Sequence, residues 1–146
     1  KLRCGGVEDH LVPSPARVAF ALRTAANVGV PIKFTAGLHH PFRHSSSSHS
    51  SVVNEEGGLA VPMHGYFNIF FAAFLAYMQN ATLDDIEKMV SEMYDKSVKF
   101  SNDGISWLGH ELPLESLQEA RERYVLSYGS CSFIEPIEDA EQYGWL

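Results

Sequence analysis

Residues 1–36 read KLRCGGVEDHLVPSPARVAFALRTAANVGVPIKFTA, and this stretch decides the fold. A short strand over residues 1–5 comes first. Ser14 is a good helix N-cap, and apolar residues then recur at helical spacing until Gly29 ends the helix. Residues 31–36 form the next strand. A strand, a helix and a strand in so short a stretch predict a βαβ unit whose strands are parallel neighbours.

The rest of the chain predicts helices and one hairpin. Residues 66–78 are apolar almost all round, which predicts a helix buried on several sides. Thr82 caps a further helix. Residues 97–108 alternate around an Asn-Asp-Gly turn and predict a β-hairpin. Apolar residues at helical spacing in 114–129 predict one long last helix.

The expected fold class is therefore α/β, with a βαβ unit of parallel strands followed by a helical region and a β-hairpin. The 146 residues would form a single domain or fragment. Its parts are the βαβ unit with the site (1–43), a flexible Ser-rich loop (44–62) and the helical region (63–146). Parallel strands need cover on both faces, so we expect a larger α/β fold, a barrel being one form, or self-association. The alternative is a self-contained α+β domain.

Charge and cysteine content exclude several classes of protein. The net charge is −7, with six Lys or Arg and two acids in residues 1–50 but five and sixteen in residues 51–146. Such a chain is a poor nucleic-acid binder. Two distant cysteines, no signal peptide and no apolar run long enough for a bilayer predict a cytoplasmic protein without membrane contact. The chain opens on Lys1 rather than on methionine, which favours a fragment of a longer protein.

Cations and glycines gather at the ends of the two predicted strands. Ligands of parallel α/β folds bind at the C-terminal ends of strands. Arg3 and Lys33 would each lie on a face without bulky apolar residues, and two neighbouring cations need an anion between them. The glycine turn would present backbone N–H groups to that anion. We predict that substrate is bound by Arg3, Gly5, Gly6 and Thr35.

Residues 37–44 place three histidines and an arginine directly after the second strand. Imidazole transfers protons near neutral pH, so His39 and His40 are predicted acid/base catalysts. Lys33 is the third predicted catalytic residue, because a lysine buried beside another cation can form a Schiff base; the plainer interpretation is a solvated lysine. A metal site from His39, His40 and His64 lacks the usual ligand spacing, and we predict no metal.

Two further pairs of residues carry groups that could bind substrate or act as nucleophiles. His64 and Asn68 lie one turn apart at the start of the buried helix, where an anion is favoured, and both are predicted to bind substrate. A helix-capping histidine packed on the core explains His64 equally well. Cys4 and Cys131 are interpreted as small packing residues. Cys131 would follow the C-terminus of the last helix, which disfavours a thiolate.

Four motifs resemble those of a family of uncharacterised, mostly bacterial proteins. They are RCGG (3–6), KFTAGLHHP (33–41), HGYFN (64–68) and SYGSCSF (127–133). The resemblance covers nearly the whole chain, and the nine-residue string 33–41 is its most specific part. Members of the family are longer and continue upstream, so the resemblance implies that this chain is a C-terminal part. It implies no reaction.

Two functions remain open from the sequence. The first is the C-terminal part of an enzyme that binds a small phosphorylated or carboxylated metabolite through Arg and Lys, with His as acid/base. Lyase, isomerase or aldolase chemistry would fit, under a loop (37–62) that closes over the site. The second is a non-catalytic assembly or interaction module. The sequence identifies no cofactor. The expected partners are a small anion and either an upstream part of the same chain or a second copy.

Overall fold

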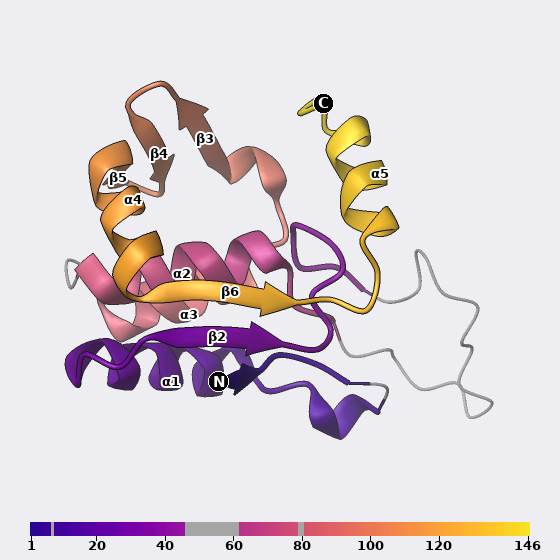
Figure 1. Cartoon of the computed structure of the whole chain (residues 1–146), viewed down its shortest axis with the longest axis horizontal. Coiled ribbons are helices and arrows are strands. Elements are labelled where there is room, and N and C mark those ends of the chain that lie inside the picture. The colour runs from indigo at the N-terminus through magenta and orange to yellow at the C-terminus, as the bar shows by residue number, and fades with distance from the viewer. Residues whose placement is uncertain (7, 46–61, 79–80) are drawn as a thin grey trace.

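The computed structural model describes residues 1–6, 8–45, 62–78 and 81–146. Its elements form a three-stranded parallel sheet, a three-stranded antiparallel sheet and the helices around them (Figure 1). In chain order they are β1 (Leu2–Arg3), η1 (Asp9–Leu11), α1 (Pro15–Asn27), β2 (Ile32–Thr35), α2 (Tyr66–Met78), α3 (Leu83–Ser91), η3 (Asp95–Ser97), β3 (Val98–Ser101), β4 (Gly104–Trp107), β5 (His110–Pro113), α4 (Leu114–Arg123), β6 (Val125–Gly129) and α5 (Ile134–Gln142).

The parallel sheet has the strand order β1-β2-β6 and confirms the predicted α/β class. Arg3 lies opposite Thr35 in the ladder, so Arg3, Lys33 and Thr35 share one face. Phe34 points to the other face and is fully buried, whereas Lys33 is exposed. The predicted βαβ unit is therefore present, and its two cations lie on the same side as expected.

Helices cover the face of this sheet that carries Phe34. The helices α1, α2 and α3 pack against one another, and the ring of Phe34 meets the edge of Phe70 in α2 at 5.5 Å. Ser14 caps α1 by accepting a hydrogen bond from the backbone N–H of Arg17, as its sequence position predicts. On the opposite face of the sheet, Arg3 and Lys33 are exposed and Thr35 is half-buried.

The second sheet is antiparallel, in the order β3-β4-β5. Its first two strands form the predicted hairpin, which turns at Asn102-Asp103 and continues at Gly104 with φ of 146°. The third strand (His110–Pro113) was not expected from the sequence. The described strands form two open sheets and no closed barrel, and none of the described helices is long and apolar enough to cross a membrane.

The prediction of one long last helix is wrong. The helix α4 ends at Arg123, and the chain then extends into β6 alongside β2. Tyr124 and Val125 are buried, and the carbonyl of Tyr124 accepts a hydrogen bond from the N–H of Ile32 at 2.7 Å. Pairing with β2 thus prevails over a helical spacing of apolar residues. The predicted flexible loop (44–62) lies almost wholly outside the described residues.

Candidate functional site

The candidate site lies where the parallel neighbours β2 and β6 end. Thr35 and Gly129, at the C-terminal ends of the two strands, are opposite each other in the ladder. The chain after β2 carries His39 and His40, and the chain after β6 carries Cys131 and then α5. Because parallel strands end at one edge of a sheet, the two loops meet there, in the position where α/β folds bind ligands.

A tight backbone turn directs the chain from β2 into this site. Ala36 and Gly37 have positive φ values of 65° and 72°. A Cβ built on Gly37 would lie 2.7 Å from the Cα of Gly5, so the two glycine loops pack backbone to backbone. Arg3 Nε donates to the carbonyl of Gly5 at 2.8 Å. In the described structure the glycines therefore act through close packing; their predicted contact with an anion stays a prediction.

His40 is held by a nearly buried carboxylate of α5. Its Nδ1 donates to Oδ2 of Asp139 at 2.8 Å, and the two side chains are only 13% and 11% exposed. The ring of His40 also meets that of His44 edge-on, with centroids 4.3 Å apart. A hydrogen-bonded carboxylate fixes the orientation of an imidazole and stabilises its protonated form.

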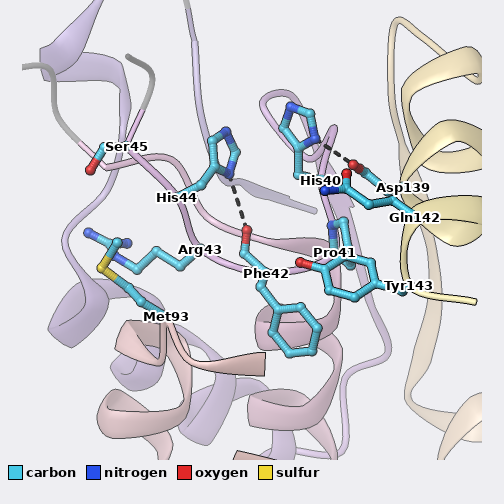
Figure 2. A pocket seen from close by; sticks show the side chains of 10 residues that line it. All are labelled: His40, Pro41, Phe42, Arg43, His44, Ser45, Met93, Asp139, Gln142 and Tyr143. Carbon is cyan, nitrogen blue, oxygen red and sulfur yellow. Dashed lines mark hydrogen bonds and ion pairs between the residues drawn. The ribbon is translucent and has the colours of Figure 1, made fainter. Parts of the chain in front are cut away.

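A cavity of about 320 Å³ opens beside this pair (Figure 2). Arg43 and Met93 lie at one end of it, and His40, Asp139 and Gln142 lie at the other. The remaining lining residues are Pro41, Phe42, His44, Ser45 and Tyr143.

Arg43 supplies the positive charge of the cavity. Its NH1 donates to Nδ1 of His64 at 2.7 Å, and within the described residues no carboxylate pairs with it. Burial lowers the pKa of the Arg43 guanidinium below its ordinary value. A half-buried guanidinium without a carboxylate partner is a suitable binding group for an anion.

His39 takes part in a second arrangement with α5 and Cys131. Its Nδ1 donates to Oε2 of Glu135 at 2.6 Å, and its Nε2 lies 3.4 Å from Sγ of Cys131. The hydrogen bond from His39 holds the pKa of Glu135 below its ordinary value. Cys131 follows the strand β6 and precedes α5, so the expectation that it follows a helix C-terminus is wrong.

His64 and Asn68 have structural roles. His64 is fully buried, and its Nε2 donates to the carbonyl of Pro13 at 2.7 Å. Asn68 is also fully buried; its Oδ1 accepts from the N–H of Arg43, and its Nδ2 donates to the carbonyls of Met89 and Glu92. Their predicted contact with substrate is not supported, because the protein itself surrounds and hydrogen-bonds both side chains. The alternative of a histidine packed on the core fits His64.

The remaining predicted residues lie on the sheet. Lys33 is exposed, so the burial that would favour a Schiff base is not found. Thr35 is half-buried, with its hydroxyl 3.5 Å from the carbonyl of Leu2. Neither residue, nor Arg3, lines the cavity beside His40. Cys4 is fully buried, and this burial raises its pKa to about 12, in agreement with a packing residue.

Sequence reasoning missed four residues of the site: Arg43, Cys131, Glu135 and Asp139. The two carboxylates are four residues apart in α5 and therefore lie on one face of that helix. This spacing is visible in the sequence, but it gives no sign that the helix contacts His39 and His40, which lie nearly one hundred residues away. No protein-family model, curated protein or solved structure matches this chain. Within the described ranges, no three His, Cys, Asp or Glu residues are arranged to hold a metal ion.

Proposed function

We propose that this chain belongs to an enzyme that binds a small anionic metabolite beside His40 and uses that histidine as acid/base. One observation carries the proposal. The nearly buried hydrogen bond between His40 and Asp139 faces a cavity that also contains the cation Arg43. A histidine paired with a buried carboxylate and an arginine that line the same cavity are typical of catalytic sites.

The His40–Asp139 pair is suited to proton transfer. With Nδ1 donating to Asp139, Nε2 is the nitrogen that takes a proton from the substrate or returns it. The carboxylate keeps this tautomer and stabilises the imidazolium formed during the reaction. These features support proton transfer in a lyase or isomerase reaction.

The size and charge of the cavity favour a small anion. A volume of about 320 Å³ is at the lower end of the range for small-molecule sites. Arg43 would bind a phosphate or carboxylate group, and Gln142 and Tyr143 add polar groups at the other side. The anion-binding cation is thus Arg43 in this proposal, whereas the sequence alone favoured Arg3 and Lys33.

In the alternative, a non-catalytic assembly module, this pair and Arg43 would have structural roles only, such as the contact of Arg43 with His64. Burial of a carboxylate is unfavourable unless it is paired, and the side chain of Asp139 is only 11% exposed. A reducing, cytoplasmic location is supported by two free cysteines.

A thermal-shift screen with phosphorylated and carboxylated metabolites tests the proposal. A ligand at about one hundred times its Kd adds about 2.7 kcal/mol to stability, which raises Tm by several degrees. We expect this rise to be lost in Arg43→Gln and kept in the matched control Lys33→Gln. If the rise in Tm were lost in Lys33→Gln and kept in Arg43→Gln, the anion would bind at the sheet and not in the cavity. A screen without any rise in Tm would contradict the proposal.

A further inference from the structure

We propose that Cys131 is a catalytic nucleophile that attacks acyl carbon atoms, with His39 as its base and Glu135 as the group that orients His39. This inference goes beyond the proposed function, since it concerns a thiol outside the His40 cavity and needs no anion bound there. Three side chains that contact one another in turn support this inference. Sγ of Cys131 lies 3.4 Å from Nε2 of His39, whose Nδ1 lies 2.6 Å from Oε2 of Glu135.

The hydrogen-bond directions in this series agree with one another. An ionised carboxylate accepts only, so Nδ1 of His39 carries the proton donated to Glu135. In the neutral ring Nε2 is then an acceptor, and it faces the thiol that has a proton to give. Nucleophile, base and orienting group are in the order found in thiol and serine hydrolases.

The position of Cys131 gives a substrate access to the thiol. The residue is exposed, and it lies in the loop between the C-terminal end of β6 and α5. The helix α5 begins at Ile134, three residues after Cys131. His39 is 25% exposed, so its ring is reachable but not freely solvated.

Cys4 shows the contrast within the same chain. Its thiol is fully buried and makes a long contact of 3.9 Å to the carbonyl of Leu2. Burial raises its pKa to about 12, so it stays a thiol at neutral pH. Cys4 is therefore an internal reference for an unreactive cysteine.

The proposed reaction has two balanced steps. In the first, Sγ of Cys131 bonds to the acyl carbon of an ester, the thiol proton passes to Nε2 of His39, and the C–O bond to the leaving group breaks. His39 then protonates the leaving alkoxide. In the second, the oxygen of a water bonds to the thioester carbon, and His39 takes a proton from that water. The C–S bond then breaks, and His39 returns the proton to Sγ as the carboxylic acid leaves.

Alkylation with iodoacetamide at pH 7, followed by peptide mass spectrometry, measures the first requirement without any metabolite. We expect Cys131 to react about tenfold or more faster than glutathione, while Cys4 in the folded chain does not react. His39→Asn should lower the rate of Cys131 alkylation by about tenfold, and Glu135→Gln should lower it less. His110→Asn, a histidine of β5 paired with Asp85, is the matched control and should leave the rate unchanged.

Treatment with p-nitrophenyl acetate measures the second requirement. We expect acetylation of Cys131 with an initial burst of one p-nitrophenolate per chain, then a slower steady release as water hydrolyses the thioester. Cys131→Ser should show no acetylation at this position. The inference would be overturned if Cys131 were alkylated only at the rate of glutathione, or if neither His39→Asn nor Glu135→Gln changed the alkylation rate. The absence of acetyl-Cys131 would also overturn it. The comparison with glutathione uses the unaltered chain, so it holds even if a variant fails to fold. These outcomes do not depend on the thermal-shift screen with metabolites, because that screen tests anion binding beside His40.

Discussion

Arg43 donates from NH1 to Nδ1 of His64 at 2.7 Å, and this contact joins the loop after β2 to a buried histidine that precedes α2. On its other side, His64 donates to the carbonyl of Pro13, just before α1. Burial lowers the pKa of His64 to about 4, with a further contribution from the charge of Arg43. A neutral histidine thus holds the cation of the candidate cavity and ties two chain segments together.

Stability should therefore fall with decreasing pH through the titration of His64. The unfolded chain binds a proton near pH 6.5 but the folded chain only near 4, so protonation favours unfolding in this window. The loss amounts to at most about 3 kcal/mol between pH 6.5 and 4. Urea unfolding at pH 7 and at pH 4.5 measures it.

The variant His64→Gln should be less stable at pH 7, because its amide replaces two hydrogen bonds of 2.7 Å imperfectly. It should also lose a smaller part of its stability between the two pH values than the unaltered chain does. His10→Gln, at an exposed histidine, serves as control and should keep the full pH dependence. An equal loss in His64→Gln and in the unaltered chain would show that another group titrates.

Gly37 should tolerate a side chain much less well than Gly29. Both residues have a positive φ, of 72° and 67°, which costs about 1 kcal/mol for alanine. A Cβ at Gly37 would in addition lie 2.7 Å from the Cα of Gly5, whereas a Cβ at Gly29 would meet nothing within 4 Å. Gly37→Ala should therefore cost more than Gly29→Ala in the free energy of urea unfolding, and equal costs would contradict the close packing of the two loops.

Much of the fold could be predicted because local signals agree with it. Ser14 caps α1, Thr82 caps α3 through a capping box, and the Asn-Asp-Gly turn joins β3 to β4. The strand β6 could not be predicted in this way, because residues 114–129 have apolar residues at helical spacing. Only the pairing of Val125–Gly129 with β2, a contact distant in sequence, decides between helix and strand.

Because a helix was predicted in place of β6, part of the candidate site could not be predicted either. His39 and His40 could be predicted as site residues because they directly follow β2, a strand that the sequence predicts correctly. The sequence indicated that Cys131 is a packing residue, because it would have followed the end of a helix. In the structure it follows β6. The partners Glu135 and Asp139 are nearly one hundred residues away from the histidines, and a sequence pattern carries no information on such contacts.

Asp139→Asn should destabilise the chain more than the removal of a surface carboxylate. The Asp139 side chain is 11% exposed and hydrogen-bonded to His40, so its loss should cost about 1–3 kcal/mol. Asp84 pairs with Lys88 on the surface at 71% exposure, and Asp84→Asn should cost less than about 1 kcal/mol. Urea unfolding of both variants at pH 7 gives the comparison, and equal costs would argue against a buried His40–Asp139 pair.

The last prediction concerns the exposed face of the parallel sheet. Arg3 and Lys33 are exposed there, and within the described residues the edge strands β1 and β6 each have a single neighbour. Parallel sheets are usually covered on both faces, and open edges pair readily with other strands. We therefore expect this 16.2 kDa chain on its own to self-associate through the sheet.

Size-exclusion chromatography with light scattering measures this association. The molar mass should exceed that of one chain and rise with concentration. Leu126→Lys places a charge at an exposed position of the edge strand β6, and it should shift the population toward monomer because a charged edge disfavours pairing. Leu83→Lys, at a leucine of similar exposure in α3, is the matched control and should leave the mass unchanged. A monomer at every concentration, with cooperative unfolding, would contradict the prediction and favour a self-contained α+β domain.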